Sequence, residues 1–147
     1  MIAGRIKLRN YADWKIYYYI QTDSDDTEEI IQQLARIGCS SRFLRRAENL
    51  LGAGRFNIGL TYSNPERGES VVVISKTTDI WEFFNSLAHE TDHLEKHISQ
   101  ELGFSPYSED ASYLVGEIIR AMFKSVARQM DKRKRCQCLG NGHYICF

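Results

Sequence analysis

The sequence of 147 residues lacks a net charge, a long apolar run and a signal-peptide pattern. Its 19 basic and 19 acidic side chains cancel, so the composition favours neither nucleic acid nor a membrane surface as a partner. No stretch approaches the roughly 18 apolar residues that a membrane span requires. Residues 1–7 lack the apolar core and cleavage site of a signal peptide. We therefore expect a soluble, cytoplasmic protein.

Cysteine is scarce and unevenly placed. Cys39 stands alone, whereas Cys136, Cys138 and Cys146 lie close to the end of the chain. A secreted disulfide framework spreads its cysteines through the chain, so this distribution argues against that class. The length suits one domain with its own core. We predict a single domain at residues 1–130, followed by a basic, Cys-rich tail at residues 131–147.

Hydrophobic periodicity predicts an α+β fold. Strands are expected at about 14–20, 56–62 and 71–74, and helices at about 28–38, 41–51, 79–102 and 109–130. The turn-rich segment between the last two strands suggests an antiparallel hairpin. Thr78 or Asp79 can cap the long third helix, Gly103 can end it, and Ser108 can cap the fourth. We expect a small antiparallel or mixed sheet packed against these two helices.

The long helix carries the most informative motif, His89-Glu90-Thr91-Asp92-His93. Side chains four apart on an α-helix share a face, so both imidazoles can reach one zinc ion. Glu90 lies about 100° around the helix, where it can act as a general base on zinc-bound water. The alternative is a soluble, histidine-bearing helix face on which Glu90, Asp92 and Glu95 provide polarity.

A catalytic zinc usually has three protein ligands and one open position, so a third ligand is needed. His97 is close in sequence, but three ligands from successive turns of a straight helix converge poorly on one ion. It is therefore the weaker alternative and reads better as an exposed histidine on a charged helix. A carboxylate from the next helix is the better candidate, and Glu109, Asp110 and Glu117 are all available.

Two segments resemble a known group of proteins. They are Ser86 to His93, which contains the histidine motif, and Ser108 to Gly116, which opens the next helix. Together they are similar to small zincin-like, metallopeptidase-like proteins encoded by phages, prophages and integrative elements. The likeness covers about residues 83–122, with a weaker similarity in residues 57–62. Ala88 departs from the group, which has a small hydroxyl residue before the first histidine.

The resemblance implies a zincin-like fold and a glutamate-type site. The third ligand would then be Glu109, with Asp110 as the alternative because it follows directly. Tyr113, one turn later, could steady an oxyanion, but the favoured interpretation is a core tyrosine whose hydroxyl is hydrogen-bonded. Zincins bind substrate as an added strand along a sheet edge beside the metal helix. That edge would be the strand at 56–62 or the strand at 71–74.

The tail offers a possible second zinc site. Cys136, Cys138, His143 and Cys146 provide four potential ligands, although their spacing is not that of a standard zinc knuckle. The alternative is a packed or frayed tail with free thiols. The basic run at residues 132–135 could contact nucleic acid, but it also suits a solvated helix end.

Two functions follow from these observations. The first is a zinc-dependent metallopeptidase-like hydrolase that acts on a peptide or protein, with Glu90 as the catalytic base and His89, His93 and Glu109 as ligands. The second is a non-catalytic zincin-like protein of a phage or mobile element that binds a host protein or nucleic acid.

Overall fold

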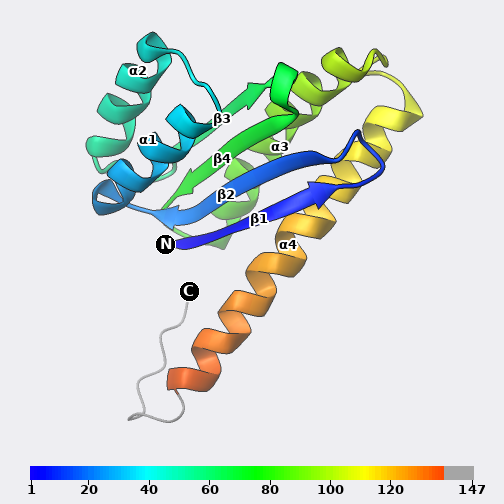
Figure 1. Cartoon of the computed structure of the whole chain (residues 1–147). Helices are drawn as coiled ribbons and strands as arrows, with labels where there is room; N and C mark the ends of the chain where they lie inside the picture. The colour runs from blue at the N-terminus through cyan, green and yellow to red at the C-terminus, as the bar shows by residue number, and fades with distance from the viewer. Residues whose placement is uncertain (138–147) are drawn as a thin grey trace.

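The computed structural model of the protein describes residues 1–137, and the side chains of all of these except residue 125 and residues 128–137. The expected α+β class is confirmed, with one mixed sheet and helices on both of its faces (Figure 1). The elements are, in chain order, β1 (Ile2–Leu8), β2 (Trp14–Thr22), α1 (Thr27–Arg36), α2 (Ser41–Gly52), β3 (Gly59–Asn64), β4 (Glu69–Ser75), α3 (Ile80–Leu102) and α4 (Glu109–Gln137). A short 3-10 turn, Ser24–Asp26, precedes α1, and a second one, Pro65–Arg67, joins β3 to β4.

The sheet has the order β1-β2-β4-β3, which makes β1 and β3 its edges. β1 is antiparallel to β2, β2 is parallel to β4, and β3 is antiparallel to β4. The predicted hairpin is therefore confirmed, with Tyr62 opposite Val71. The strand at 71–74 is central, so β3 is the edge strand of this hairpin. β1 was not predicted from the sequence.

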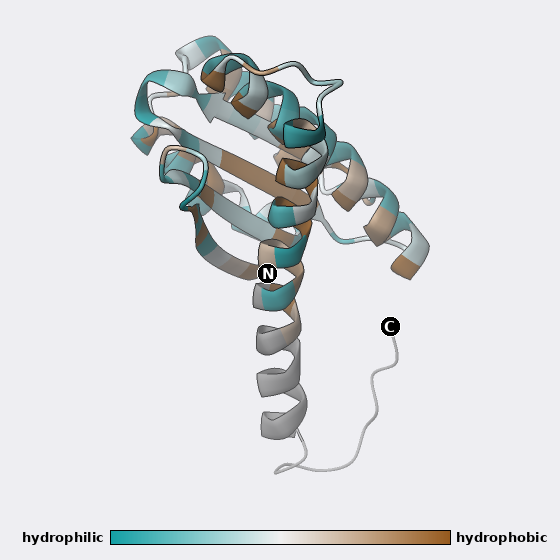
Figure 2. Cartoon of the chain, turned by 90° about the vertical axis from the view of Figure 1, so that its right-hand side faces the viewer, coloured by the Kyte–Doolittle hydropathy of each residue, from teal (hydrophilic) through white to brown (hydrophobic). Residues whose placement is uncertain are grey.

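Each face of the sheet has its own hydrophobic core. On one face α1 and α2 bury Ile30, Leu34 and Leu51 against β3 and β4. On the other face α3 and α4 bury Leu94 and Ile118 against β1, β2 and β4. Figure 2 shows the hydrophobic middle of the sheet between helices of mixed hydropathy. The residues of β2 and β4 are buried on both faces, as expected for a parallel central pair.

The long helix α3 has well-defined ends. Asp79 Oδ1 accepts hydrogen bonds from the backbone N–H groups of Trp81 and Glu82, at 2.8 and 2.9 Å. Gly103 ends the helix in the left-handed conformation, with φ 77°. Ser108 caps α4 by accepting from the backbone N–H of Ala111. These ends confirm the predicted caps, and α3 packs on the sheet face beside β3. Among residues 1–137, no helix is both long and apolar enough to cross a bilayer.

The fourth helix extends further than expected. It was predicted to end at residue 130 and continues to Gln137. The basic run at residues 132–135 therefore lies within α4. Lys and Arg are good helix formers, so a change in composition did not mark the end of the helix.

Candidate metal centre

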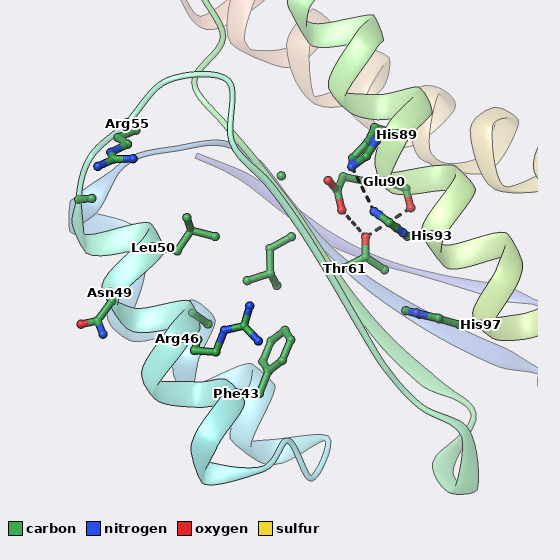
Figure 3. Close-up of a pocket in the computed structure, with 14 residues that line it drawn as sticks. Phe43, Arg46, Asn49, Leu50, Arg55, Thr61, His89, Glu90, His93 and His97 are labelled. Carbon is green, nitrogen blue, oxygen red and sulfur yellow. Dashed lines mark hydrogen bonds between the residues drawn. The ribbon is translucent and has the colours of Figure 1, made fainter.

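A groove with a volume of about 770 Å³ follows the open edge of β3. One wall is formed by α2 and the loop after it, and the other by α3 (Figure 3). His89, Glu90, His93 and His97 all line the groove from the α3 side. The structure thus brings the histidine motif to the exposed edge of the sheet.

His89 and His93 point toward one another across one turn of α3 (Figure 3). Their Nε2 atoms lie 3.1 Å apart, and their rings are nearly perpendicular, with an interplanar angle of 83°. Two imidazole nitrogens bound to one tetrahedral zinc at about 2.0–2.1 Å would be separated by roughly 3.3 Å. The observed pair therefore fits two ligands of a zinc ion.

Glu90 is buried beneath this pair, with 3% of its surface exposed. Thr61 Oγ1 on β3 donates a hydrogen bond to Glu90 Oε2 at 2.7 Å. Gly59, also on β3, lets the carboxylate pack against the strand, because a Cβ at that position would lie 2.0 Å from Glu90 Oε1. The carboxylate is therefore held in one place by a strand that is distant in sequence.

His97 belongs to a polar chain that crosses the sheet. Trp14 Nε1 donates to Ser70 Oγ at 2.8 Å, Ser70 Oγ lies 2.7 Å from Ser63 Oγ, and Ser63 Oγ lies 2.9 Å from His97 Nδ1. Indole N–H can only donate, so every donor is used when Ser70 donates to Ser63 and Ser63 donates to His97. In that arrangement His97 accepts at Nδ1 and carries its proton on Nε2, whereas in the other tautomer Nδ1–H donates to Ser63 and Ser63 donates to Ser70.

The surroundings of His97 also affect its charge. Burial and the neighbouring His93 lower the pKa of the His97 imidazole, which favours the neutral ring. The expectation of an exposed histidine on a charged helix is therefore wrong, since His97 is half-buried and bonded to Ser63.

The acidic residues of the motif region have different environments. Asp92 is exposed and accepts a hydrogen bond from Lys96 Nζ at 2.6 Å, and this interaction lowers the pKa of Asp92. Glu95 is buried, with 4% of its surface exposed, and accepts a hydrogen bond from Ser99. The alternative of three acids that merely keep the helix soluble thus applies to Asp92 and not to Glu90 or Glu95.

The proposed ligands from α4 lie elsewhere. Glu109 and Asp110 are exposed at the start of α4, and neither lines the groove. The last nine residues of α3, 94–102, follow His93 and span about 14 Å along the helix axis. Tyr113 is 68% exposed, so the interpretation of this residue as a core tyrosine is wrong. Glu117 accepts a hydrogen bond from Asn10 at 2.9 Å, away from the histidines.

The remaining predicted ligands belong to the tail. Cys136 is in the last turn of α4, within the part of the chain whose side chains are not described. Cys138, His143 and Cys146 lie outside the described residues. The second zinc site stays a prediction. Among the residues whose side chains the structure describes, no group of three or more His, Cys, Asp or Glu is arranged to hold a metal ion, so the third ligand also stays a prediction.

Sequence reasoning missed the β3 side of the site. Thr61, Ser63 and Gly59 contact α3 because alternate side chains of a strand point to the same face. In the sequence, Gly59 and Thr61 alternate with the apolar residues Ile58, Leu60 and Tyr62. What the sequence did not indicate was the residue of α3 opposite each of them.

Comparisons with protein-family models, with curated proteins and with solved structures give no match. The resemblance to zincin-like proteins of mobile elements therefore remains a prediction.

Proposed function

We propose that this chain is a zinc-dependent metallopeptidase in which His89 and His93 bind the metal and Glu90 is the general base. The observation that carries the proposal is the pair of Nε2 atoms 3.1 Å apart, directly beside a buried carboxylate in an open groove. A bound zinc ion would supply a Lewis acid that acidifies water and polarises a carbonyl group.

The position of Glu90 supports its role as base. Its Oε2 accepts from Thr61, so the carboxylate is held still while retaining lone pairs for a further proton. In this role Glu90 takes a proton from the attacking water and passes it to the leaving amine. Because Glu90 also lines the groove, a substrate in the groove can reach it.

The edge strand supports a peptide as the substrate. β3 pairs with β4 on one side, and its other side borders the groove. Unpaired backbone groups of an edge strand can pair with an extended peptide by β-augmentation. The peptide backbone would then pass next to His89 and His93.

The resemblance favours Glu109 of α4 as the third ligand, with Asp110 as the alternative, although neither residue lines the groove in the structure. The two can be separated by measuring zinc affinity in Glu109→Gln and Asp110→Asn. The variant that lacks the true ligand should lose at least as much zinc affinity as the loss of an outer-shell partner causes, which is about 10- to 100-fold. Zinc affinity unchanged in both variants would exclude both residues.

The proposal is tested by metal content and by cleavage. The purified chain is expected to bind one zinc at the histidines, and a second only if the Cys tail also binds zinc. Glu90→Gln should keep the zinc at the histidines and abolish cleavage of a peptide mixture, measured by mass spectrometry. Absence of zinc would contradict the metal site. Zinc without cleavage in the natural sequence would instead support a non-catalytic binding protein.

A further inference from the structure

The wall of the groove opposite the histidines is basic. Arg46 extends from α2 toward β3, and Arg55 lies on the loop that follows α2 (Figure 3). Both are exposed, and in the described part of the chain neither has an acidic partner. Glu90 is the single acidic residue that lines the groove within residues 1–137, and its carboxylate is bound by Thr61. The groove therefore presents two unpaired guanidinium groups to its occupant.

The alternation of β3 relates these arginines to an added strand. Leu60 and Tyr62 pack on the face covered by α1 and α2, whereas Thr61 and Ser63 bind residues of α3. Successive side chains of any strand added to this edge also alternate between the two faces. Every second side chain would therefore turn toward α2 and its arginines, and the others toward the histidines.

We propose that the groove selects an extended peptide with acidic side chains at alternate positions, whose carboxylates bind Arg46 and Arg55. The inference rests on the proposed function for the position of the peptide along β3, and it adds the class of substrate. A guanidinium group binds a carboxylate through paired N–H donors, which gives both affinity and orientation. Leu50, which is 38% exposed in the same groove, adds an apolar contact between the charged ones.

A single-stranded nucleic acid would also bring anions to the arginines, but the groove suits a peptide better. Proteins that bind single-stranded nucleic acid without sequence preference use aromatic rings on which the bases stack. Phe43 lines the groove, but its ring packs against Tyr62, with centroids 4.8 Å apart. The backbone groups along β3 match another peptide backbone and have no regular counterpart in a nucleic acid.

Binding to the full-length chain tests this inference without cleavage, in the Glu90→Gln background. The probes are a short fluorescent peptide of alternating Glu and Thr, its counterpart with Gln in place of Glu, and an oligothymidylate of the same length. The test variant carries Arg46→Gln and Arg55→Gln. A control variant carries Arg42→Gln and Arg45→Gln, which removes the same charge from exposed positions of α2 that do not line the groove.

The Glu peptide should bind roughly tenfold more tightly than the Gln peptide. That preference should fall below about threefold in the Arg46 and Arg55 variant and persist in the control variant. Equal affinity for the two peptides, or an equal loss in the control variant, would overturn the inference. The inference would be overturned in favour of nucleic acid if the oligothymidylate bound more tightly than the Glu peptide and lost that binding in the Arg46 and Arg55 variant. An acidic preference in a protein that binds no zinc would support the groove assignment and contradict the peptidase.

Discussion

Thr61 Oγ1 on the edge strand lies 2.7 Å from Glu90 Oε2 on α3. The two residues are 29 positions apart, and their contact joins the sheet edge to the proposed base. The same hydroxyl lies 3.3 Å from the backbone carbonyl of Glu90. The hydroxyl has one proton, and the shorter distance makes the carboxylate its main acceptor, so this hydrogen bond fixes the Glu90 side chain against β3.

Thr61→Val should destabilise the protein and lower its activity. Valine keeps the branched shape but removes the donor, which leaves a buried carboxylate without its partner. We expect a loss of about 1–3 kcal/mol in the free energy of unfolding, measured by urea denaturation. The kcat/KM of the proposed peptidase activity should fall with it, while Thr61→Ser should retain most of both. Equal stability of the valine and serine variants would show that the hydrogen bond contributes nothing.

Gly59→Ala should disturb the base by direct contact. The added Cβ would lie 2.0 Å from Glu90 Oε1, so the carboxylate must move or the strand must shift. We expect a cost of about 1–3 kcal/mol in the free energy of unfolding, as for other overpacked sites. In a Glu90→Ala background the obstructing atoms are absent, so the same substitution should cost much less. A cost that is the same in both backgrounds would place the strain elsewhere.

The elements that carry the motif could be predicted because their signals are local. The apolar period of α3, its Asp79 cap and Gly103 at its end all lie within one continuous segment. β1 was missed although its side chains alternate, because Gly4 interrupts the apolar pattern. The structure explains that glycine: a Cβ there would lie 2.1 Å from the Tyr18 hydroxyl on the neighbouring strand.

The contacts of the site could be predicted only in part. The spacing of His89 and His93 fixes their shared face, because four residues make about one helical turn. The contacts between Thr61 and Glu90 and between Ser63 and His97 depend on how α3 lies on the sheet. That orientation results from packing across the whole core, and a local sequence pattern contains no information on it.

The stability of the metal-free protein should fall in mild acid through His97. Burial and the neighbouring His93 lower the pKa of His97 in the folded state. In the unfolded chain the ordinary value is about 6.5, so below that pH the unfolded state binds more protons. The stability that the neutral His97 contributes is complete above about pH 6.5. It is lost as the pH falls through the lowered pKa of His97 in the folded state. His97→Gln, which can still accept from Ser63, should show a shallower fall between about pH 7.5 and 5.5 in urea denaturation. Identical profiles would exclude His97 as the titrating group.

The zinc affinity of the histidine pair should depend on His89 and His93 and not on His97. The first two present Nε2 atoms 3.1 Å apart, whereas a third ligand from the next turn of the same straight helix converges poorly on the same ion. His89→Ala and His93→Ala should each weaken zinc binding by more than about 100-fold, since even outer-shell partners contribute about 10- to 100-fold. His97→Ala should stay within about threefold of the natural sequence. Competition with a chromophoric chelator measures these affinities, in a background where Cys136, Cys138 and Cys146 are serine so that the tail cannot contribute. A large loss in His97→Ala would make His97 a third ligand through Nε2, with its Nδ1–H donating to Ser63 and Ser63 donating to Ser70.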